Sequence, residues 1–550
     1  MDTKLEETNV DLLAEQDLHK LGYQQAMTRT RGLPHILFMT LAIMAVPFGL
    51  AAPFATGLVG GGPVTTFWGW VLVSFFTMFT ALSLAEISAK YPTSGGAYYW
   101  CFRLAKTRET GLLASWICGW FIMVGVWTIC LSVTFGTGQL LVAGIGMFKT
   151  DWNPEAWQTY LIFLAVLFFS TAIGIFCNKI LPLIDILSAY FTIIGTLVIF
   201  ICVSAKAATG RRSASFALGD FDPESGWTPG WSFFIGLLPV CFLPVMAFGR
   251  HSLAAIDPYY SVYHLAYTYS AIGMITNMAE EVHNPTVQLP RALVWSIPIG
   301  FIEGVFFLLP ILFTLPDIAT LLAVPTGQPI ALMFELIMGN KAGGFGLWFI
   351  IFVIGLFCAI SICCAASRAT WAFARDKALP FHAFFSQINP DSDVPIPAYF
   401  LTTVIQLLLG LIYLGSSAAF NAFVGVAVIC LGASYAIPIG MSLYGRRKNV
   451  EDSPYSLGRW GWWINAVAVL WILFEIVLFS MPAIIPVTPS TMNYASVVFV
   501  GFAVISGVWY VINGRFNYSG PPLPQEDLAT SGSSPTSSVE AEPKDLKRSE

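Results

Sequence analysis

Long apolar runs separated by short polar segments divide most of this sequence. A helix needs about 20 consecutive apolar residues to cross a bilayer, and eleven continuous runs have about this length or more. With a split sixth run added, the pattern predicts an all-α integral membrane protein of twelve transmembrane helices. The continuous spans are expected at 36–59, 64–84, 112–145, 157–176, 180–204, 292–315, 345–372, 396–414, 418–443, 462–485 and 494–512.

The first and sixth runs contain residues that interrupt helices. Run 36–59 holds Pro47, Gly49 and Pro53 near its middle; proline lacks an amide donor and glycine weakens a helix. The sixth run passes through the small residues of 270–273 before it ends in two glutamates. Backbone that leaves helical geometry inside a bilayer is tolerated where it lines a cavity or binds something. Two such breaks at matching places predict a transporter of inverted repeats with a site at mid-membrane.

The sixth run is also split by segment 240–265, which does not suit a membrane interior. It carries four ionisable side chains, Arg250, His251, Asp257 and His264, and burying each of them unpaired would cost several kcal/mol. An extra span here would reverse the orientation of every later span. We therefore hypothesise that 240–265 is no part of a working transporter. It is a translated intron, the first choice, or a natural insertion in an inactive variant. If the mature transcript keeps the segment and the full-length protein transports, this hypothesis is wrong and the segment becomes a candidate extracellular lid over the site.

The distribution of Lys and Arg predicts the orientation in the membrane. With the N-terminus in the cytoplasm, the inside segments hold 21 basic residues and the outside loops five, with Arg250 left over. Basic residues are enriched on the cytoplasmic side, so both termini are expected inside. Residues 1–35 form a polar cytoplasmic arm, 36–513 form the transporter domain, and 514–550, rich in Ser, Pro, Glu and Lys, are expected to be a disordered cytoplasmic tail.

Composition excludes several other classes of protein. Charged residues make up 11% of the chain and hydrophobic residues 56%, whereas a soluble protein carries about a quarter charged residues. The lipid bilayer is therefore an expected partner, and nucleic acid is not. The ten cysteines show no metal spacing and indicate neither a disulfide framework, a metal site nor a cofactor. The six histidines lack the spacing of a catalytic constellation, and no repeated filter motif of a channel is present.

Five motifs, in order along the chain, resemble a known family. They are GLVGGGPVTTFWGW at 57–70, AEISAKYPTSGGAYYW at 85–100, AEEVHNPTVQLPRA at 279–292, SRATWAFARDKALPF at 367–381 and FNAFVGVAVICLGASYAIPIG at 420–440. Over roughly residues 20–515 the chain resembles the amino acid–polyamine–organocation superfamily, within it the fungal branch of amino acid, choline and 4-aminobutyrate permeases. The resemblance implies a LeuT-like fold of 5+5 inverted repeats plus two C-terminal helices, with broken helices 1 and 6. It also implies substrate bound between those helices and uptake driven by protons.

The half-ends of the broken helices form the expected substrate site. Free amides at such ends bind a carboxylate, and free carbonyls bind an ammonium group. The backbone at the first break is contributed by Val46, Pro47, Phe48, Gly49, Leu50 and Ala51. Carbonyls and a polar, aromatic wall at the second come from Tyr267, Tyr269, Ser270, Ala271, Ile272, Gly273, Thr276 and Asn277. This wall is neutral, which suits a zwitterion better than a polycation. Several relatives place an aspartate in the break of span 6, and this chain does not.

Ionisable residues inside spans are costly and are therefore functional candidates. Asp185, in span 5, is the first candidate for proton coupling, because span 5 of coupled relatives faces the position of a sodium ion in other members of the fold. The alternative is that Asp185 lies at the interface and caps a helix near Lys179. Glu303, in span 7, is the second candidate. Glu303 and Glu475 lie on helices away from the expected site, where packing or a local ion pair is the simpler interpretation.

Charged residues and glycines near the cytoplasmic face are expected to form a gate and scaffold. They are Glu86, Gly95, Gly96, Glu280, Glu281, Arg368, Arg375 and Asp376. The broken spans thus predict a transporter, and the resemblance implies that it is a secondary active one that imports a small amino acid, 4-aminobutyrate, choline or a related amine with protons, by alternating access. The plasma membrane is the expected location and the vacuolar membrane the second choice. The alternatives are a non-transporting nutrient sensor on the same scaffold and an inactive variant.

Overall fold

The computed structural model describes residues 2–51, 54–149, 152, 154–223, 225–236, 267–322, 324, 328–415, 417–482, 485–488 and 492–522. Within these ranges the regular secondary structure is helical, and β-pairing is limited to two isolated bridges. The predicted all-α class is therefore confirmed. Eleven helical segments are long and apolar enough to cross a membrane, which identifies an integral membrane protein. Segment 240–265 lies outside the described residues.

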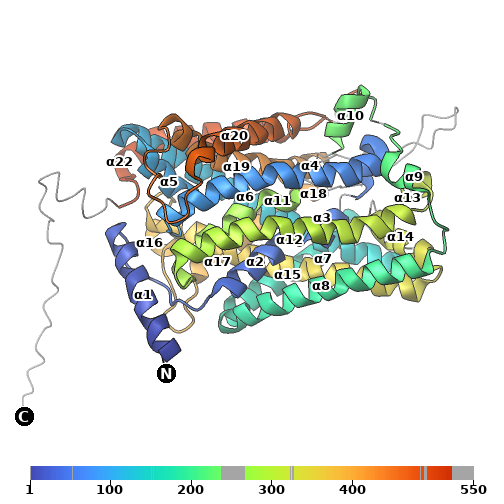
Figure 1. Cartoon of the computed structure of the whole chain (residues 1–550), viewed down its shortest axis with the longest axis horizontal. Coiled ribbons are helices and arrows are strands. Elements are labelled where there is room, and N and C mark those ends of the chain that lie inside the picture. The colour runs from blue at the N-terminus through green and yellow to red at the C-terminus, as the bar shows by residue number, and fades with distance from the viewer. Residues whose placement is uncertain are drawn as a thin grey trace, which may run out of the picture.

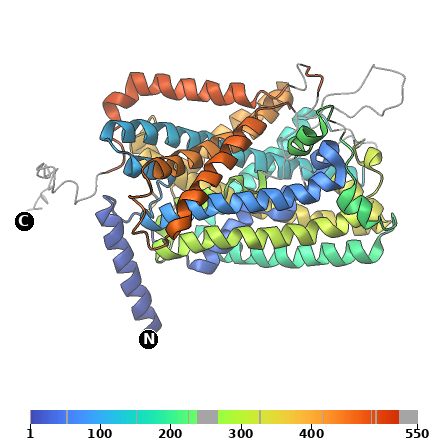
Figure 2. The same ribbon diagram turned by 45° about the horizontal axis from the view of Figure 1, so that its top comes forward.

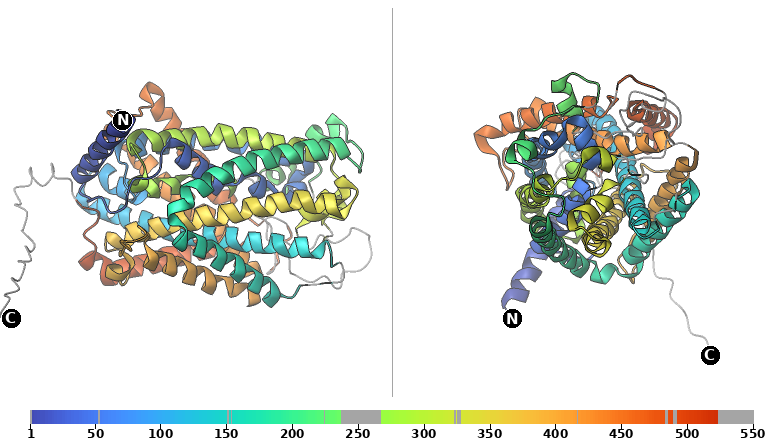
Figure 3. Two further views of the ribbon diagram at one scale, coloured as in Figure 1. Left: turned by 90° about the horizontal axis from the view of Figure 1, so that it is seen from below. Right: turned by 90° about the vertical axis from the view of Figure 1, so that its right-hand side faces the viewer.

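The long helices lie side by side along the length of the molecule (Figure 1). They are α2 (Leu33–Met44), α4 (Phe54–Lys90), α6 (Arg108–Gly146), α7 (Ala156–Phe176), α8 (Leu181–Lys206), α12 (Pro285–Phe313), α15 (Lys341–Arg375), α17 (Ile396–Gly410), α19 (Ser417–Tyr444), α20 (Gly461–Leu478) and α21 (Ala495–Trp509). Each overlaps a predicted continuous run, although α2 covers only the first part of run 36–59 and α4 begins inside that run and continues through run 64–84. Seen along their axes, these helices form one bundle (Figure 3).

Short helices gather at the two ends of the bundle. One end, named here the α1 end, holds α1 (Asp2–Lys20), α5 (Ala97–Leu104), α16 (His382–Phe385) and α22 (Arg515–Asn517). The opposite end, the α9 end, holds α9 (Ala214–Gly219), α10 (Pro229–Ile235), α13 (Ile318–Leu322) and α14 (Pro329–Met338). Both terminal helices lie at the α1 end (Figures 1 and 2). The basic residues Lys20 on α1, Arg103 on α5 and Arg515 on α22 lie at this end as well.

The first span is interrupted at Ala45. Its φ of 42° is left-handed, and it separates α2 from α3 (Val46–Ala51). The cause is Pro47, which has no amide to donate and whose ring would clash with the carbonyl of Ile43 in a continuous helix. That carbonyl instead accepts a hydrogen bond from Cys358 Sγ at 3.2 Å. Further on, α4 changes direction at Gly61 and Gly62. These glycines lie between the predicted end of span 1 at residue 59 and the predicted start of span 2 at residue 64.

The second break lies between α11 (Tyr267–Ser270) and η2 (Ile272–Glu281). Ala271 separates them, with φ −90° and ψ 7°. After this break the chain is helical again, and the helix ends at Glu281, as the sequence predicts. However, this helix, η2, is a 3₁₀ helix of 10 residues. Such helices rarely exceed three or four residues, and a long one inside a span marks strain or a hinge.

Candidate functional site

The two broken spans touch each other. Gly49 on α3 lies against Thr268 on α11, so closely that a Cβ atom at Gly49 would stand 2.5 Å from Thr268 Oγ1. Any larger residue there would force the two segments apart. The hydroxyl of Thr268 is buried and has no hydrogen-bond partner among the described residues. The half-ends expected from sequence to form one site therefore do lie together.

The predicted substrate residues are nearly all buried. Val46 to Ala51 are buried without exception, and between Tyr267 and Asn277 only Ser270 is half-buried. Several of their polar groups are already engaged with neighbours. The ring of Tyr269 stacks on Trp70 at a centroid distance of 4.8 Å, and its hydroxyl lies 3.0 Å from Ser74 Oγ. Ser270 Oγ donates to the carbonyl of Tyr267 at 2.7 Å. Tyr269 is thus tied to span 2.

Two small cavities flank η2, and Tyr435 on α19 lines both of them. One, of about 10 Å³, is walled by residues such as Trp100 and Asn277. The other, of about 30 Å³, includes Thr80, Ser270 and Glu475 in its wall. One water molecule needs on the order of 10–15 Å³ by the same measure, so neither cavity admits an amino acid.

Tyr435 is the site residue that sequence reasoning missed. Its ring covers Gly273, where a Cβ atom would stand 2.6 Å from Tyr435 Cζ. The side chain is only 6% exposed, and its hydroxyl has no hydrogen-bond partner among the described residues. Tyr435 lies inside the motif at 420–440. The one feature of the sequence that could have indicated a site residue here is a single tyrosine in an otherwise apolar helix.

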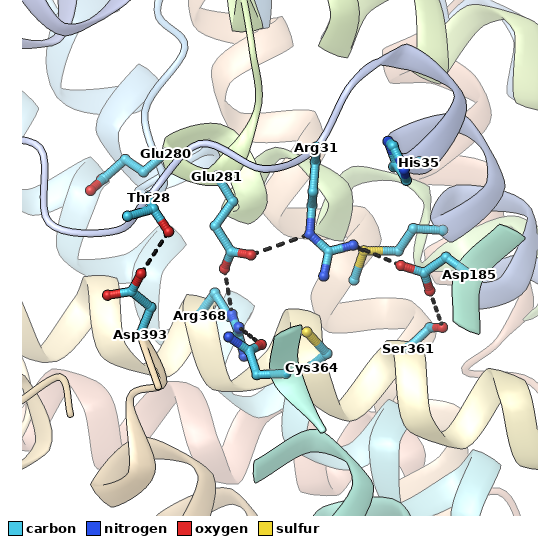
Figure 4. A network of polar contacts seen from close by, with 12 residues as sticks. Thr28, Arg31, His35, Asp185, Glu280, Glu281, Ser361, Cys364, Arg368 and Asp393 are labelled. Atoms are coloured by element: carbon cyan, nitrogen blue, oxygen red, sulfur yellow. Dashed lines mark hydrogen bonds and ion pairs between the residues drawn. The ribbon is translucent and has the colours of Figure 1, made fainter. Parts of the chain in front are cut away.

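A buried ionic network joins the first proton candidate to the predicted gate (Figure 4). Arg31 Nη1 donates to Asp185 Oδ2 at 2.7 Å, and Arg31 Nε donates to Glu281 Oε2 at 3.2 Å. The other Glu281 oxygen accepts from Arg368 Nε at 2.8 Å. Asp185 Oδ1 also accepts from Ser361 Oγ at 3.0 Å. The side chains of Arg31 and Arg368 are each 1% exposed, so this network is shielded from water.

Asp185 is therefore paired with Arg31, and it is buried within α8, whose N-cap is Ile180, rather than capping a helix near Lys179. In the sequence, Arg31 is one of the basic residues that precede the first span, and nothing local marks it as the partner of Asp185. Its backbone is fixed as well, since its amide donates to the carbonyl of Glu281 at 3.0 Å and its carbonyl accepts from the amide of His283 at 2.9 Å. The N-terminal arm is thus built into the network.

A second cluster lies beside the first, at the α1 end. Arg375 Nη1 donates to Glu280 Oε1 at 2.8 Å. Asp376 accepts from the hydroxyls of Tyr23, at 2.7 Å, and Tyr98, at 2.8 Å. Burial raises the pKa of the Asp376 carboxyl above its usual range, against the lowering effects of Arg375 and of both hydroxyls. Tyr23 comes from the N-terminal arm, so this arm closes both clusters.

The remaining predicted residues lie apart from these clusters. Glu86 accepts from the guanidinium of Arg447 and from the amide of Leu457 at 2.8 Å, which ties α4 to the segment after α19. Gly96, with φ 53°, approaches Thr276 so closely that its Cβ would stand 2.8 Å from Thr276 Oγ1. The neighbouring Gly95 precedes it in the same turn before α5.

Glu303, the second proton candidate, lies outside the network. It accepts a hydrogen bond from Thr196 Oγ1 at 3.4 Å, which joins α12 to α8.

The first part of the predicted disordered tail is packed against the bundle. Tyr518, within the predicted tail, is 5% exposed and shares a hydrogen bond of 2.8 Å with Ser115. The tail beyond residue 522 lies outside the described residues.

Comparison with known proteins agrees with this architecture. Residues 32–504 match the family model described as amino acid permease. The choline transporter of Saccharomyces cerevisiae is 29% identical over 85% of this chain and 78% of its own length. Amino-acid permease BAT1 of Arabidopsis thaliana is 31% identical over 92% and 95%. The polyamine transporter TPO5 of S. cerevisiae is 30% identical over 93% and 80%.

The match spans nearly all of the described helices, from α2 through most of α21. It includes both broken spans, Tyr435 and the buried ionic network apart from Arg31, which lies just before the matched residues. The relatives are transporters and not enzymes. This chain belongs to the amino acid permease family of the amino acid–polyamine–organocation superfamily.

Proposed function

We propose that this permease imports a small amino acid, 4-aminobutyrate, choline or a related amine across the plasma membrane, coupled to protons, by alternating access. In this proposal the spans form a LeuT-like arrangement of twelve helices, with 5+5 inverted repeats and two further helices. Both termini, and with them the α1 end, face the cytoplasm. The observation that carries the proposal is the contact of the two broken spans at Gly49 and Thr268. Relatives named as choline, amino-acid and polyamine transporters support the substrate class.

The ionic network supplies a gate for this cycle. It closes the α1 end by tying the N-terminal arm and α8 to the end of η2 and to α15 through Arg31, Asp185, Glu281 and Arg368. A buried ion pair is strongly destabilised when one partner loses its charge. A proton bound to Asp185 would remove the charge that holds Arg31 Nη1, and would favour opening of this end. Proton binding and release of substrate to the cytoplasm are thereby linked.

Replacing Asp185 with Asn tests this coupling. Asn keeps the shape and the acceptor oxygen but cannot carry the coupling proton. We expect the variant to show a flat pH dependence of net uptake, while exchange of labelled for unlabelled substrate continues. The measurement is initial uptake rate between pH 4.5 and 7.5 at equal surface expression. A pH profile like that of the wild-type protein would remove Asp185 from the mechanism, and Glu303→Gln would be tested next.

The substrate class is tested in cells that lack their own amine and amino-acid permeases. The full-length protein is expressed, and uptake of labelled 4-aminobutyrate, choline and several amino acids is measured with each as competitor. The proposal requires saturable uptake of at least one of them above the empty-vector background. Absence of uptake across the panel, with the protein present at the cell surface, would contradict it.

A further inference from the structure

Helix α20 brings a carboxylate to the break of the sixth span. Glu475 lines the cavity of about 30 Å³ together with Ser270, Ile272 and Tyr435. Sequence reasoning placed Glu475 away from the site, in packing or a local ion pair. The structure differs, because α20 packs against α4 and α19 and turns this residue toward the cavity. Among the residues lining that cavity, Glu475 is the one charged group.

Glu475 has no ion-pair partner among the described residues. The indole of Trp471, one turn earlier on α20, approaches its carboxylate without reaching hydrogen-bond geometry. The opposite face of α20 is apolar and exposed, with Leu470 67% and Val477 53% accessible. An unpaired carboxylate in such a helix is costly within a bilayer and marks a functional position.

Two further residues that line this cavity carry hydroxyl groups without hydrogen-bond partners among the described residues. Thr80 Oγ1 and Tyr435 Oη are buried, with their residues 5% and 6% exposed, and neither has a hydrogen-bond partner among the described residues. Buried polar atoms are nearly always hydrogen-bonded, and those left unpaired call for an explanation. The cavity therefore offers three unused acceptors, one of them a carboxylate.

We propose that this cavity binds the primary ammonium group of the substrate, with Glu475 as the anionic partner and Thr80 and Tyr435 as further acceptors. A primary ammonium group has three N–H donors and about the size of one water, for which this cavity has room. A trimethylammonium group has no N–H donor and is larger. The proposal rests on the proposed function and refines it: span 11 supplies the carboxylate that span 6 lacks, and primary amines are preferred over quaternary ones.

The test uses two ligands that differ only in this head group, 4-aminobutyrate and 4-(trimethylammonio)butyrate. Purified full-length protein in detergent is heated with each ligand, and the shift in melting temperature gives the dissociation constant. We expect 4-aminobutyrate to stabilise the wild-type protein. Glu475→Gln should weaken its binding at least about tenfold, since hydrogen bonds to charged groups are the strong ones, and Tyr435→Phe should weaken it less. Glu335→Gln, which removes a half-buried carboxylate on α14 at the α9 end, is the matched control and should bind normally.

The same variants are then assayed for uptake, which separates this inference from the proposed function. Weakened binding in Glu475→Gln but not in Glu335→Gln supports the inference, whether or not a ligand is transported. Absence of transport would contradict only the proposed function. Equal affinity of wild-type and Glu475→Gln protein for 4-aminobutyrate would overturn the inference. Tighter binding of the trimethylated ligand to wild-type protein would overturn it as well, whatever the uptake results.

Discussion

Replacing Gly49 with Leu should abolish transport, and so should Gly273→Leu. At Gly49 the first added carbon would already stand 2.5 Å from Thr268 Oγ1 and 3.1 Å from its Cγ2. At Gly273 it would stand 2.6 Å from Tyr435 Cζ. The remaining atoms of leucine have no space in so close a contact, and overpacking forces backbone shifts. Insertion into the membrane depends on the apolar spans and should continue, so we expect normal surface expression with uptake below detection.

The matched control is Gly440→Leu. Gly440 lies in α19, the helix that carries Tyr435, but apart from the adjoining part of α19 itself, no atom of the described residues lies within 4 Å of an added Cβ. This variant should transport at close to the wild-type rate, measured as initial uptake per protein at the cell surface. Normal uptake kinetics in Gly49→Leu or Gly273→Leu would refute the assignment of the broken spans as the substrate site.

Replacing Glu281 with Gln should release the ionic network and open the α1 end. Glu281 is the shared partner of Arg31 and Arg368, both buried. Removing one partner of a buried ion pair costs about 3–5 kcal/mol, as much as or more than the few kcal/mol that typically separate two conformations of a protein. The closed conformation should therefore become a minor one, and net uptake should fall at least about tenfold.

The native Cys364 reports on this opening. It is 1% exposed and lies beside Arg368 within the network (Figure 4). A membrane-impermeant thiol reagent applied from the cytoplasmic face should modify Cys364 in Glu281→Gln but hardly at all in the wild-type protein, as measured by mass spectrometry of the peptide. Glu86→Gln breaks a different carboxylate–arginine contact and should leave Cys364 protected. Equal protection of Cys364 in Glu281→Gln and wild type would show that the network is not a gate.

Patterns local in the sequence predicted the spans and both breaks. The apolar runs fixed the long helices, because a bilayer demands a set length of apolar chain. Pro47 predicted the break in span 1, and its ring places that break at Ala45. The small residues 270–273 predicted the break in span 6, although not that the following helix is 3₁₀.

Contacts between distant residues could not be predicted in the same way. Arg31 meets Asp185 across 154 positions of sequence and Glu281 across 250, and no local pattern carries that pairing. The directions of Tyr435 and Glu475 depend on how α19 and α20 are rotated against α4. Both helices are apolar over most of their faces, so hydrophobic periodicity gives little information about rotation. Glu475 was visible as an intramembrane carboxylate, but its cavity was not.

Transport against a gradient is the most direct test of the central claim. The purified protein is reconstituted into liposomes with an acidic exterior, and uptake of the labelled compound that performs best in the competitor panel is followed over time. We predict accumulation above the external concentration, which collapses when a protonophore is added. Accumulation that is unchanged by the protonophore would contradict proton coupling. If none of the compounds in the panel enters the liposomes, the assignment as a transporter is contradicted.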